Sequence, residues 1–165
     1  MKWKPEALDP DVRVRLDLHA KERVLAWADD GAGRPVVATE TALHLQRVPP
    51  EYARFGWEQI ERASYEAGML TVVLGDSLGG ATLRIPVGEE RQLPVVVRDR
   101  VTASVVVDRF VALSGDSGVR IVGRRAVDGG VTWRSVLDPV LTTDDAWIAA
   151  SQEALAEVRA EVGEG

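Results

Sequence analysis

Residues 59–87 read QIERASYEAGMLTVVLGDSLGGATLRIPV, and the predicted fold rests on the pattern of this stretch. Two runs of strand-forming residues, 59–67 and 69–74, meet at Gly68, where a glycine favours the tight turn of a β-hairpin. A third run, 80–87, follows a glycine-rich loop. Short strands joined by short turns predict an antiparallel sheet.

The same spacing of strands and turns continues on the N-terminal side of this stretch. Four further runs have the composition of strands: 22–29, 34–39, 42–46 and 54–57. Val48-Pro49-Pro50 ends the third of these runs, because proline cannot lie in a central ladder. Together the seven short strands predict an antiparallel barrel or sandwich.

The pattern changes at Pro94, a residue type that favours the start of a helix. We expect a short helix near 94–102 and then a strand, because the run 102–113 is rich in β-branched residues that disfavour helix. Two further strands, 118–126 and 130–137, are separated by turn-forming residues.

The chain is predicted to end in an amphipathic helix. Thr142-Thr143-Asp144-Asp145 provides capping residues and negative charge for its start, and Gly163 ends it. Apolar and small residues recur at helical spacing on one face of this segment: Ile148, Ser151, Leu155, Val158 and Val162.

These elements place the chain in the α+β class and suggest three segments. Residues 1–21 form a leader that we expect to be a short helix or turn, with Trp3 exposed. Residues 22–102 form the antiparallel barrel with its short helix. Residues 103–165 form an extension of additional strands, a hairpin or meander, with the C-terminal amphipathic helix. We expect the segments to pack as one globular unit.

Composition excludes several classes of function. The chain has 165 residues, a net charge of -6 and no cysteine, so disulfides and thiolate metal sites are excluded. The acidic balance argues against a sequence-independent hold on nucleic acid or acidic lipid. Two histidines give no metal site, and no phosphate-binding or dinucleotide fingerprint indicates a cofactor. Without a signal peptide or a membrane span, a cytoplasmic protein is expected.

Two Gly-Asp-Ser motifs raise the alternative of a serine hydrolase. Gly75-Asp76-Ser77-Leu78 resembles the nucleophile block of GDSL esterases, and Gly115-Asp116-Ser117 resembles the nucleophile loop of chymotrypsin-like proteases. Either serine would need His44 as its base. Leu43 and Leu45 alternate inward, which is predicted to leave His44 at the surface. We therefore interpret both motifs as turns, in which Gly, Asp and Ser are the usual residues.

Four arginines form a candidate anion-binding or partner-binding patch. Arg120 and Arg124 alternate onto one face of their strand, Arg134 lies on the facing strand, and Arg125 is adjacent. A solvated face paired with acidic residues is the favoured interpretation. A peripheral membrane-surface module built on this arginine hairpin is a further alternative.

The block from Glu22 to Val87 resembles a bacterial pleckstrin-homology-like (PH-like) domain. The resemblance rests on Glu22-Arg23-Val24-Leu25, on Gly33 leading into Val36-Val37-Ala38-Thr39, on Ala42-Leu43-His44-Leu45, on Trp57-Glu58-Gln59-Ile60 opening a strand pair around Gly68, and on Leu83-Arg84-Ile85-Pro86. The whole chain is similar to PH-like proteins of actinobacteria.

The resemblance implies a seven-stranded bent barrel whose C-terminal helix is supplied by residues 94–102. It implies binding rather than catalysis. It does not imply phosphoinositide recognition, because the barrel is reused for many partners. We therefore expect a non-catalytic cytoplasmic scaffold that binds another protein or a second copy of itself. The exposed edges of the additional strands suit strand addition.

Overall fold

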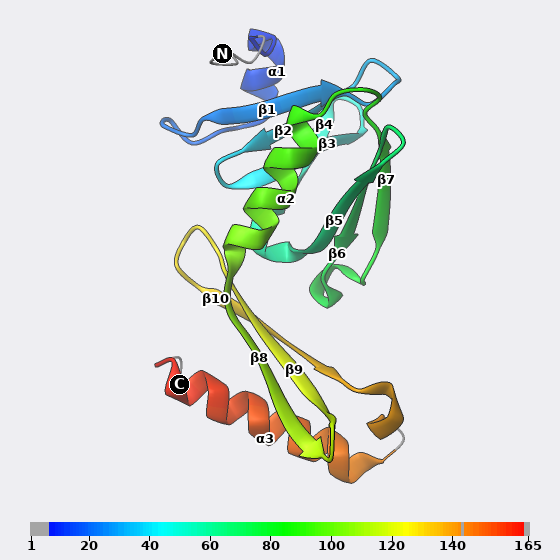
Figure 1. Cartoon of the computed structure of the whole chain (residues 1–165). Coiled ribbons are helices and arrows are strands. Elements are labelled where there is room, and N and C mark those ends of the chain that lie inside the picture. Colours follow the sequence, from blue (N-terminus) through cyan, green and yellow to red (C-terminus); the bar gives the residue numbers. More distant parts are fainter. Residues whose placement is uncertain (1–6, 143, 164–165) are drawn as a thin grey trace. The chain divides into compact units, whose positions relative to one another are not determined.

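The computed structural model describes residues 7–142 and 144–163 and is α+β, as predicted (Figure 1). The prediction for Trp3 lies outside the described residues. The chain divides into two compact units, residues 1–104 and 105–165. That they pack as one globular unit stays a prediction.

The first sheet of unit 1 is an antiparallel meander in the order β1-β2-β3-β4. Its strands are β1 (Val24–Asp29), β2 (Pro35–Thr39), β3 (Ala42–Val48) and β4 (Glu51–Gly56). Between the first two strands, the Asp30 carboxylate accepts hydrogen bonds from the backbone N–H groups of Ala32 and Arg34. All four predicted strands are confirmed, although β4 begins at Glu51, earlier than the predicted residue 54.

The second sheet of unit 1 is the stretch quoted first. Two short 3-10 helices, η1 (Trp57–Gln59) and η2 (Asp76–Leu78), accompany the strands β5 (Ile60–Glu66), β6 (Met69–Leu74) and β7 (Thr82–Pro86). Glu66 pairs with Met69 across the predicted hairpin turn. Both turn residues have positive φ, 48° at Ala67 and 79° at Gly68, which suits the right-handed twist of the paired strands.

These seven strands form two sheets and not one closed barrel, which corrects the expected closure. The ladder stops after β4 because the backbone turns into η1, where the N–H of Gly56 donates to Oε1 of Gln59 at 2.9 Å. The strands of the two sheets run in different directions in Figure 1. An apolar core nevertheless joins them through residues such as Leu43, Ile60 and Leu70.

Helix α2 (Gln92–Ser104) packs against β1, β2, β5 and η1. It contributes Leu93, Val97 and Val101 to the same core. The predicted helix is therefore confirmed, but it starts before Pro94 and continues to Ser104. The Ser104 hydroxyl donates to the carbonyl of Val101 at 2.7 Å, and β8 begins at the next residue.

Helix α1 (Pro10–Arg15) confirms the short helix expected in the leader. Asp9 caps its N-terminus, and Pro10 takes the first position, where a missing N–H costs nothing. Val12 and Leu16 of this segment pack with Val37 on the face of the β1–β4 sheet opposite the main core. Both faces of that sheet are therefore covered.

Unit 2 is a three-stranded antiparallel sheet with one long helix. Its elements are β8 (Val105–Ser114), β9 (Ser117–Arg125), β10 (Val131–Leu137), η3 (Pro139–Leu141) and α3 (Asp145–Glu161), and the strand order is β10-β9-β8. Val119 and Ile121 of the sheet pack against Ala154 and Val158 of α3. The additional strands and the C-terminal helix are confirmed.

The buried face of α3 differs in part from the predicted one. Asp144 is the N-cap, and its carboxylate accepts from the N–H of Ala146 at 2.8 Å. Ser151 and Val158 are buried as expected, but Ile148 and Val162 are exposed. Ala154 is buried in their place, because the helix presents to the sheet a face rotated toward its smaller residues.

Candidate functional site

The β8–β9–β10 sheet brings three of the four predicted arginines onto one face. Arg120 pairs with Phe110 on β8 and with Val136 on β10, while Val122 pairs with Asp108 and Arg134 in the same way. Directly paired residues share a face of an antiparallel sheet. We call the face opposite α3 the open face; its residues are Asp108, Phe110, Arg120, Val122, Arg124, Thr132, Arg134 and Val136.

Charge on the open face is dominated by arginine. Arg120 makes a two-pronged ion pair with Asp108, with Nε to Oδ1 at 2.7 Å and Nη2 to Oδ2 at 2.5 Å. This hydrogen bonding holds the pKa of Asp108 below its ordinary value. Burial lowers the pKa of Arg124, and the charge of Asp108 opposes that shift. By its own residues the open face carries three arginines and one aspartate.

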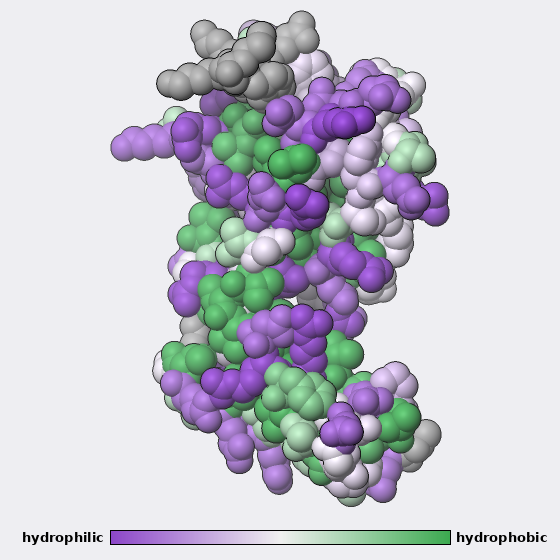
Figure 2. Space-filling view, viewed as in Figure 1, coloured by the Kyte–Doolittle hydropathy of each residue, from purple (hydrophilic) through white to green (hydrophobic). Residues whose placement is uncertain are grey.

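Apolar side chains lie between these charges. Phe110 is 56% exposed and Val136 is 44% exposed, whereas Val119 and Ile121 on the α3 side of the sheet are buried. Figure 2 shows apolar and hydrophilic atoms interleaved over this unit. An exposed apolar surface bordered by charge is typical of a contact surface for another molecule.

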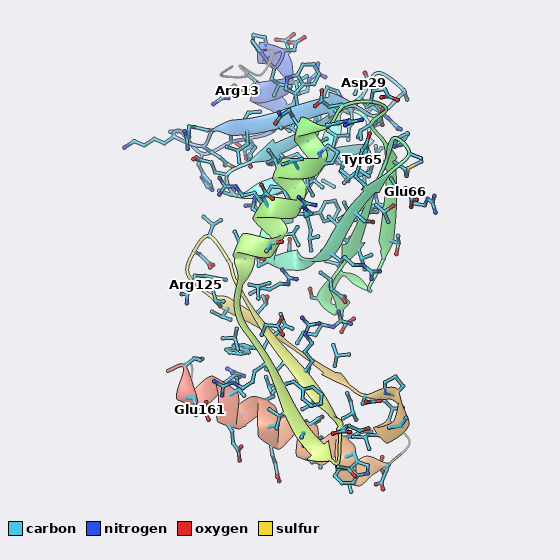
Figure 3. All side chains as sticks on the ribbon, viewed as in Figure 1. Arg13, Asp29, Tyr65, Glu66, Arg125 and Glu161 are labelled. Atoms are coloured by element: carbon cyan, nitrogen blue, oxygen red, sulfur yellow. The ribbon has the colours of Figure 1, made fainter. Side chains whose placement is uncertain are left out.

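Arg125 does not join this group. It pairs with Val131, one position beyond Arg124, and therefore lies on the other face of the sheet. Its Nη1 donates to the carbonyl oxygen of Gly129 at 3.4 Å, within the β9–β10 turn where Figure 3 labels it. The alternation of the strand alone separates Arg125 from Arg120 and Arg124.

A second polar group, which the sequence reasoning missed, lies in unit 1, where four buried polar residues contact one exposed arginine. We call it the Glu22 cluster: Glu22, Thr39, Thr41, His44 and Arg54. The Glu22 carboxylate accepts hydrogen bonds from the hydroxyls of Thr39, at 2.5 Å, and Thr41. Nε2 of His44 lies 3.5 Å from the Thr39 hydroxyl, and Arg54 donates to the Thr41 hydroxyl at 3.1 Å. The sequence did offer a signal for this cluster: Thr39 and Thr41 stand at and just after the end of β2, and Glu22 precedes the neighbouring strand β1.

His44 is only 2% exposed, so the prediction that it lies at the surface is wrong. Its side chain does point away from Leu43 and Leu45, but α1 and the leader cover that face of the sheet. Burial lowers the pKa of His44 to about 4, with Glu22 opposing the shift and Arg54 adding to it. The imidazole is therefore neutral at physiological pH.

Glu22 is ionised in this buried setting. Burial acts to raise the pKa of its carboxyl, but the hydrogen bonds from Thr39 and Thr41 outweigh burial, and the pKa lies below its ordinary value. Each member of the cluster is thereby satisfied by its neighbours. The cluster has a structural role, because it holds Glu22, just before β1, against Thr39 and Thr41 at the β2–β3 turn.

The two Gly-Asp-Ser motifs form turns, as interpreted from the sequence. Ser77 lies in η2, which ends at Gly79 with φ of 74°. Ser117 opens β9 directly after Gly115, whose φ is 57°. Within residues 7–142, neither serine hydrogen-bonds to His44, whose ring contacts Thr39.

Other classes of site were sought in the described segments. They contain no group of three or more His, Asp or Glu side chains placed to hold a metal ion. None of their helices has the length and apolar character needed to cross a lipid bilayer. Comparison with protein-family models, curated proteins and solved structures finds no match to this chain. Its function is therefore inferred from its own residues.

Proposed function

We propose that the chain is a non-catalytic cytoplasmic binding or scaffold protein whose partner is another protein. The observation that carries this proposal is the open face, where Phe110 and Val136 are exposed on either side of Arg120. Arginine and aromatic residues are enriched in protein interfaces, where they supply contact area and directed hydrogen bonds. A partner with apolar side chains and carboxylates would complement this surface.

We further propose that unit 1 is a PH-like domain. Four antiparallel strands are followed by three antiparallel strands and then by one helix that packs on both sheets. This order of elements supports the resemblance drawn from residues 22–87. PH-like domains serve as binding modules, which agrees with a scaffold role and does not specify a ligand.

The two alternatives have weaker support. A serine hydrolase needs a base within reach of its nucleophile, and His44 is buried against Thr39 and Glu22. A membrane-surface module needs accessible cationic charge, and the Arg120 guanidinium is already engaged by Asp108. The protein partner is favoured because the open face offers apolar area as well as charge.

The test is photo-cross-linking from a benzophenone amino acid placed at Val136, in the native cell with membranes retained. The matched control carries the same amino acid at Val140, which is also exposed in unit 2 but lies in η3. We expect a discrete protein adduct at Val136 that is absent at Val140. The adduct should weaken at least tenfold when Arg124→Glu and Arg134→Glu are combined.

Two outcomes would contradict the proposal. Adducts of equal yield at Val136 and Val140 would mean that the open face has no dedicated partner. Salt-sensitive binding of the purified protein to vesicles containing phosphatidylserine, lost in the same double variant, would favour the membrane-surface alternative.

A further inference from the structure

Strand β8 lies at the edge of its sheet and is the longest strand among the described residues. It spans ten residues, Val105–Ser114, and its only strand partner in the sheet order of the described residues is β9. The backbone N–H and C=O groups directed away from β9 therefore have no ladder on that side. Unpaired edges of this kind accept a further strand from another chain.

The charged residues that would protect this edge are held within unit 2. Asp108 is bound by Arg120 of β9, and Arg109 forms an ion pair with Glu161 of α3, which Figure 3 labels near the end of that helix. Charged side chains and β-bulges protect edge strands from association, and the irregular steps of β8 are confined to its two ends, between Val105 and Val107 and between Ala112 and Ser114. Here each charge is already neutralised by its own unit, and Phe110 stands exposed beside them.

We propose that the occupant of this edge is a second copy of the chain, paired through antiparallel β8 strands about a twofold axis at Phe110. The two three-stranded sheets then form one six-stranded sheet with both α3 helices on the same face. This self-association goes beyond the partner proposed for the open face: it shares Phe110 with that face, but it pairs the β8 edge and leaves β10 free.

The register follows from the side chains that meet. A twofold axis perpendicular to the sheet pairs residues of the same face, so position 110 faces its own copy. Phe110 then contacts the second Phe110, an aromatic cross-strand pair. On the α3 side Arg109 meets Val111, and Val107 meets Leu113, which lies in the irregular step of the β8–β9 ladder between Ala112 and Ser114. Val107, Val111 and Leu113 already border the apolar cluster of that face. The apolar layer under α3 thereby continues from one copy into the other.

Neighbouring registers are less favourable. A shift that centres the axis on Asp108 places two carboxylates opposite each other, and one that centres it on Arg109 does the same for two guanidinium groups. Like charges directly opposite destabilise a strand pair. Centring on Val111 avoids the clash but shortens the overlap and separates the two Phe110 rings. The Phe110 register combines long overlap with no charge conflict.

The absence of cysteine from the chain allows a direct test of this register. In Phe110→Cys the two introduced thiols lie opposite each other, within the distance that a disulfide spans. In the control Ala112→Cys, on the same exposed face, they lie about 13 Å apart, four residues along the strand. Under mild copper-phenanthroline oxidation we expect a disulfide-linked dimer from Phe110→Cys at least tenfold faster than from Ala112→Cys.

Sedimentation of the protein without introduced cysteine provides the second measurement. We expect a concentration-dependent monomer–dimer equilibrium, at least tenfold weaker in Phe110→Arg and unchanged in the matched Val136→Arg. A monomer at all concentrations, equal cross-linking of the two cysteine variants, or loss of the dimer in Val136→Arg would each overturn the β8 interface. If the protein is monomeric but still forms the protein adduct at Val136, the β8 interface is wrong and the proposed function stands. If the protein dimerises but forms no such adduct, the β8 interface stands and the proposed protein partner of the open face is wrong.

Discussion

The β1–β4 and β8–β10 sheets share the alternation of inward and outward side chains, yet only the first is covered on both faces by elements of its own unit. In β3, Leu43 and His44 are both buried, because the main core covers one face and α1 with the leader covers the other. In β9, Val119 and Ile121 are buried by α3, whereas the side chain of Arg120 is 61% exposed between them.

The comparison shows that alternation fixes which side chains share a face but not whether that face meets solvent. α1 and the residues beside it pack on the face of the sheet that holds Val37, which pairs with His44, and His44 is buried there. No described element of unit 2 does the same for the open face. The difference between the sheets should therefore appear in stability, in pH dependence and in tolerance of substitution.

The largest expected effect is that of a core truncation in the covered sheet. Leu43→Ala removes a fully buried side chain and should lower the free energy of unfolding of unit 1 by about 3 kcal/mol. The matched variant Val136→Ala on the open face should cost unit 2 less than about 0.5 kcal/mol. Urea titration followed by the amide NMR signals of each unit measures both. Equal losses of unfolding free energy in the two variants would contradict the claim that only the β1–β4 position is critical for folding.

The next effect concerns the Glu22 cluster. Glu22→Ala leaves the hydroxyls of Thr39 and Thr41 without their carboxylate acceptor, which should destabilise unit 1 by about 2 kcal/mol. Glu40→Ala is the control, because Glu40 pairs with Arg23 at the surface and should matter much less. The same urea titration applies, and a Glu22→Ala loss no larger than the control would mean that the cluster is not structural.

Acid should weaken the covered sheet through His44. The folded protein keeps His44 neutral down to its pKa of about 4, whereas the unfolded chain binds the proton near 6.5. The corresponding stability is complete well above pH 6.5 and is lost as pH falls toward 4, by about 3 kcal/mol. Glu22 adds to the loss only below its ordinary pKa of 4.5. Unfolding free energies of the wild type and His44→Gln between pH 7 and pH 5 test this: the variant should show the shallower slope.

The smallest effect is expected on the open face. Asp108→Asn removes the charge that Arg120 binds, but both side chains are substantially exposed, so the loss should be about 0.5 kcal/mol or less. The variant should increase the positive charge of the open face while unit 2 stays folded, as measured by the same urea titration. A loss above about 2 kcal/mol would indicate that Asp108 is a structural residue like Glu22.

Much of the fold was predictable because its information is local. Hairpin glycines such as Gly68, prolines at strand ends and the Asp144 cap act within a few residues of where they stand, and the elements they delimit are confirmed. The segment after Pro94 followed the same logic: β-branched residues end the helix and begin the strand within two residues of the predicted position.

What could not be predicted depends on contacts between distant segments. The burial of His44 requires α1, which lies far from it in sequence, and the role of Glu22 requires Thr39 and Thr41 to approach it across the sheet. For the candidate site, alternation placed Arg120, Arg124 and Arg134 together. The ion pair with Asp108 came from a third strand whose register no local pattern specifies.

The exposure of the open face also bears on how this protein can change over generations. Substitutions at exposed positions such as Val136 alter folding little, so natural selection acts on them mainly through whatever they bind. Substitutions at the buried residues Leu43 or His44 change the stability of the fold, so selection acts on them first through folding. New specificity can therefore arise on β8–β10 by mutational drift, while β1–β4 remains a constrained support.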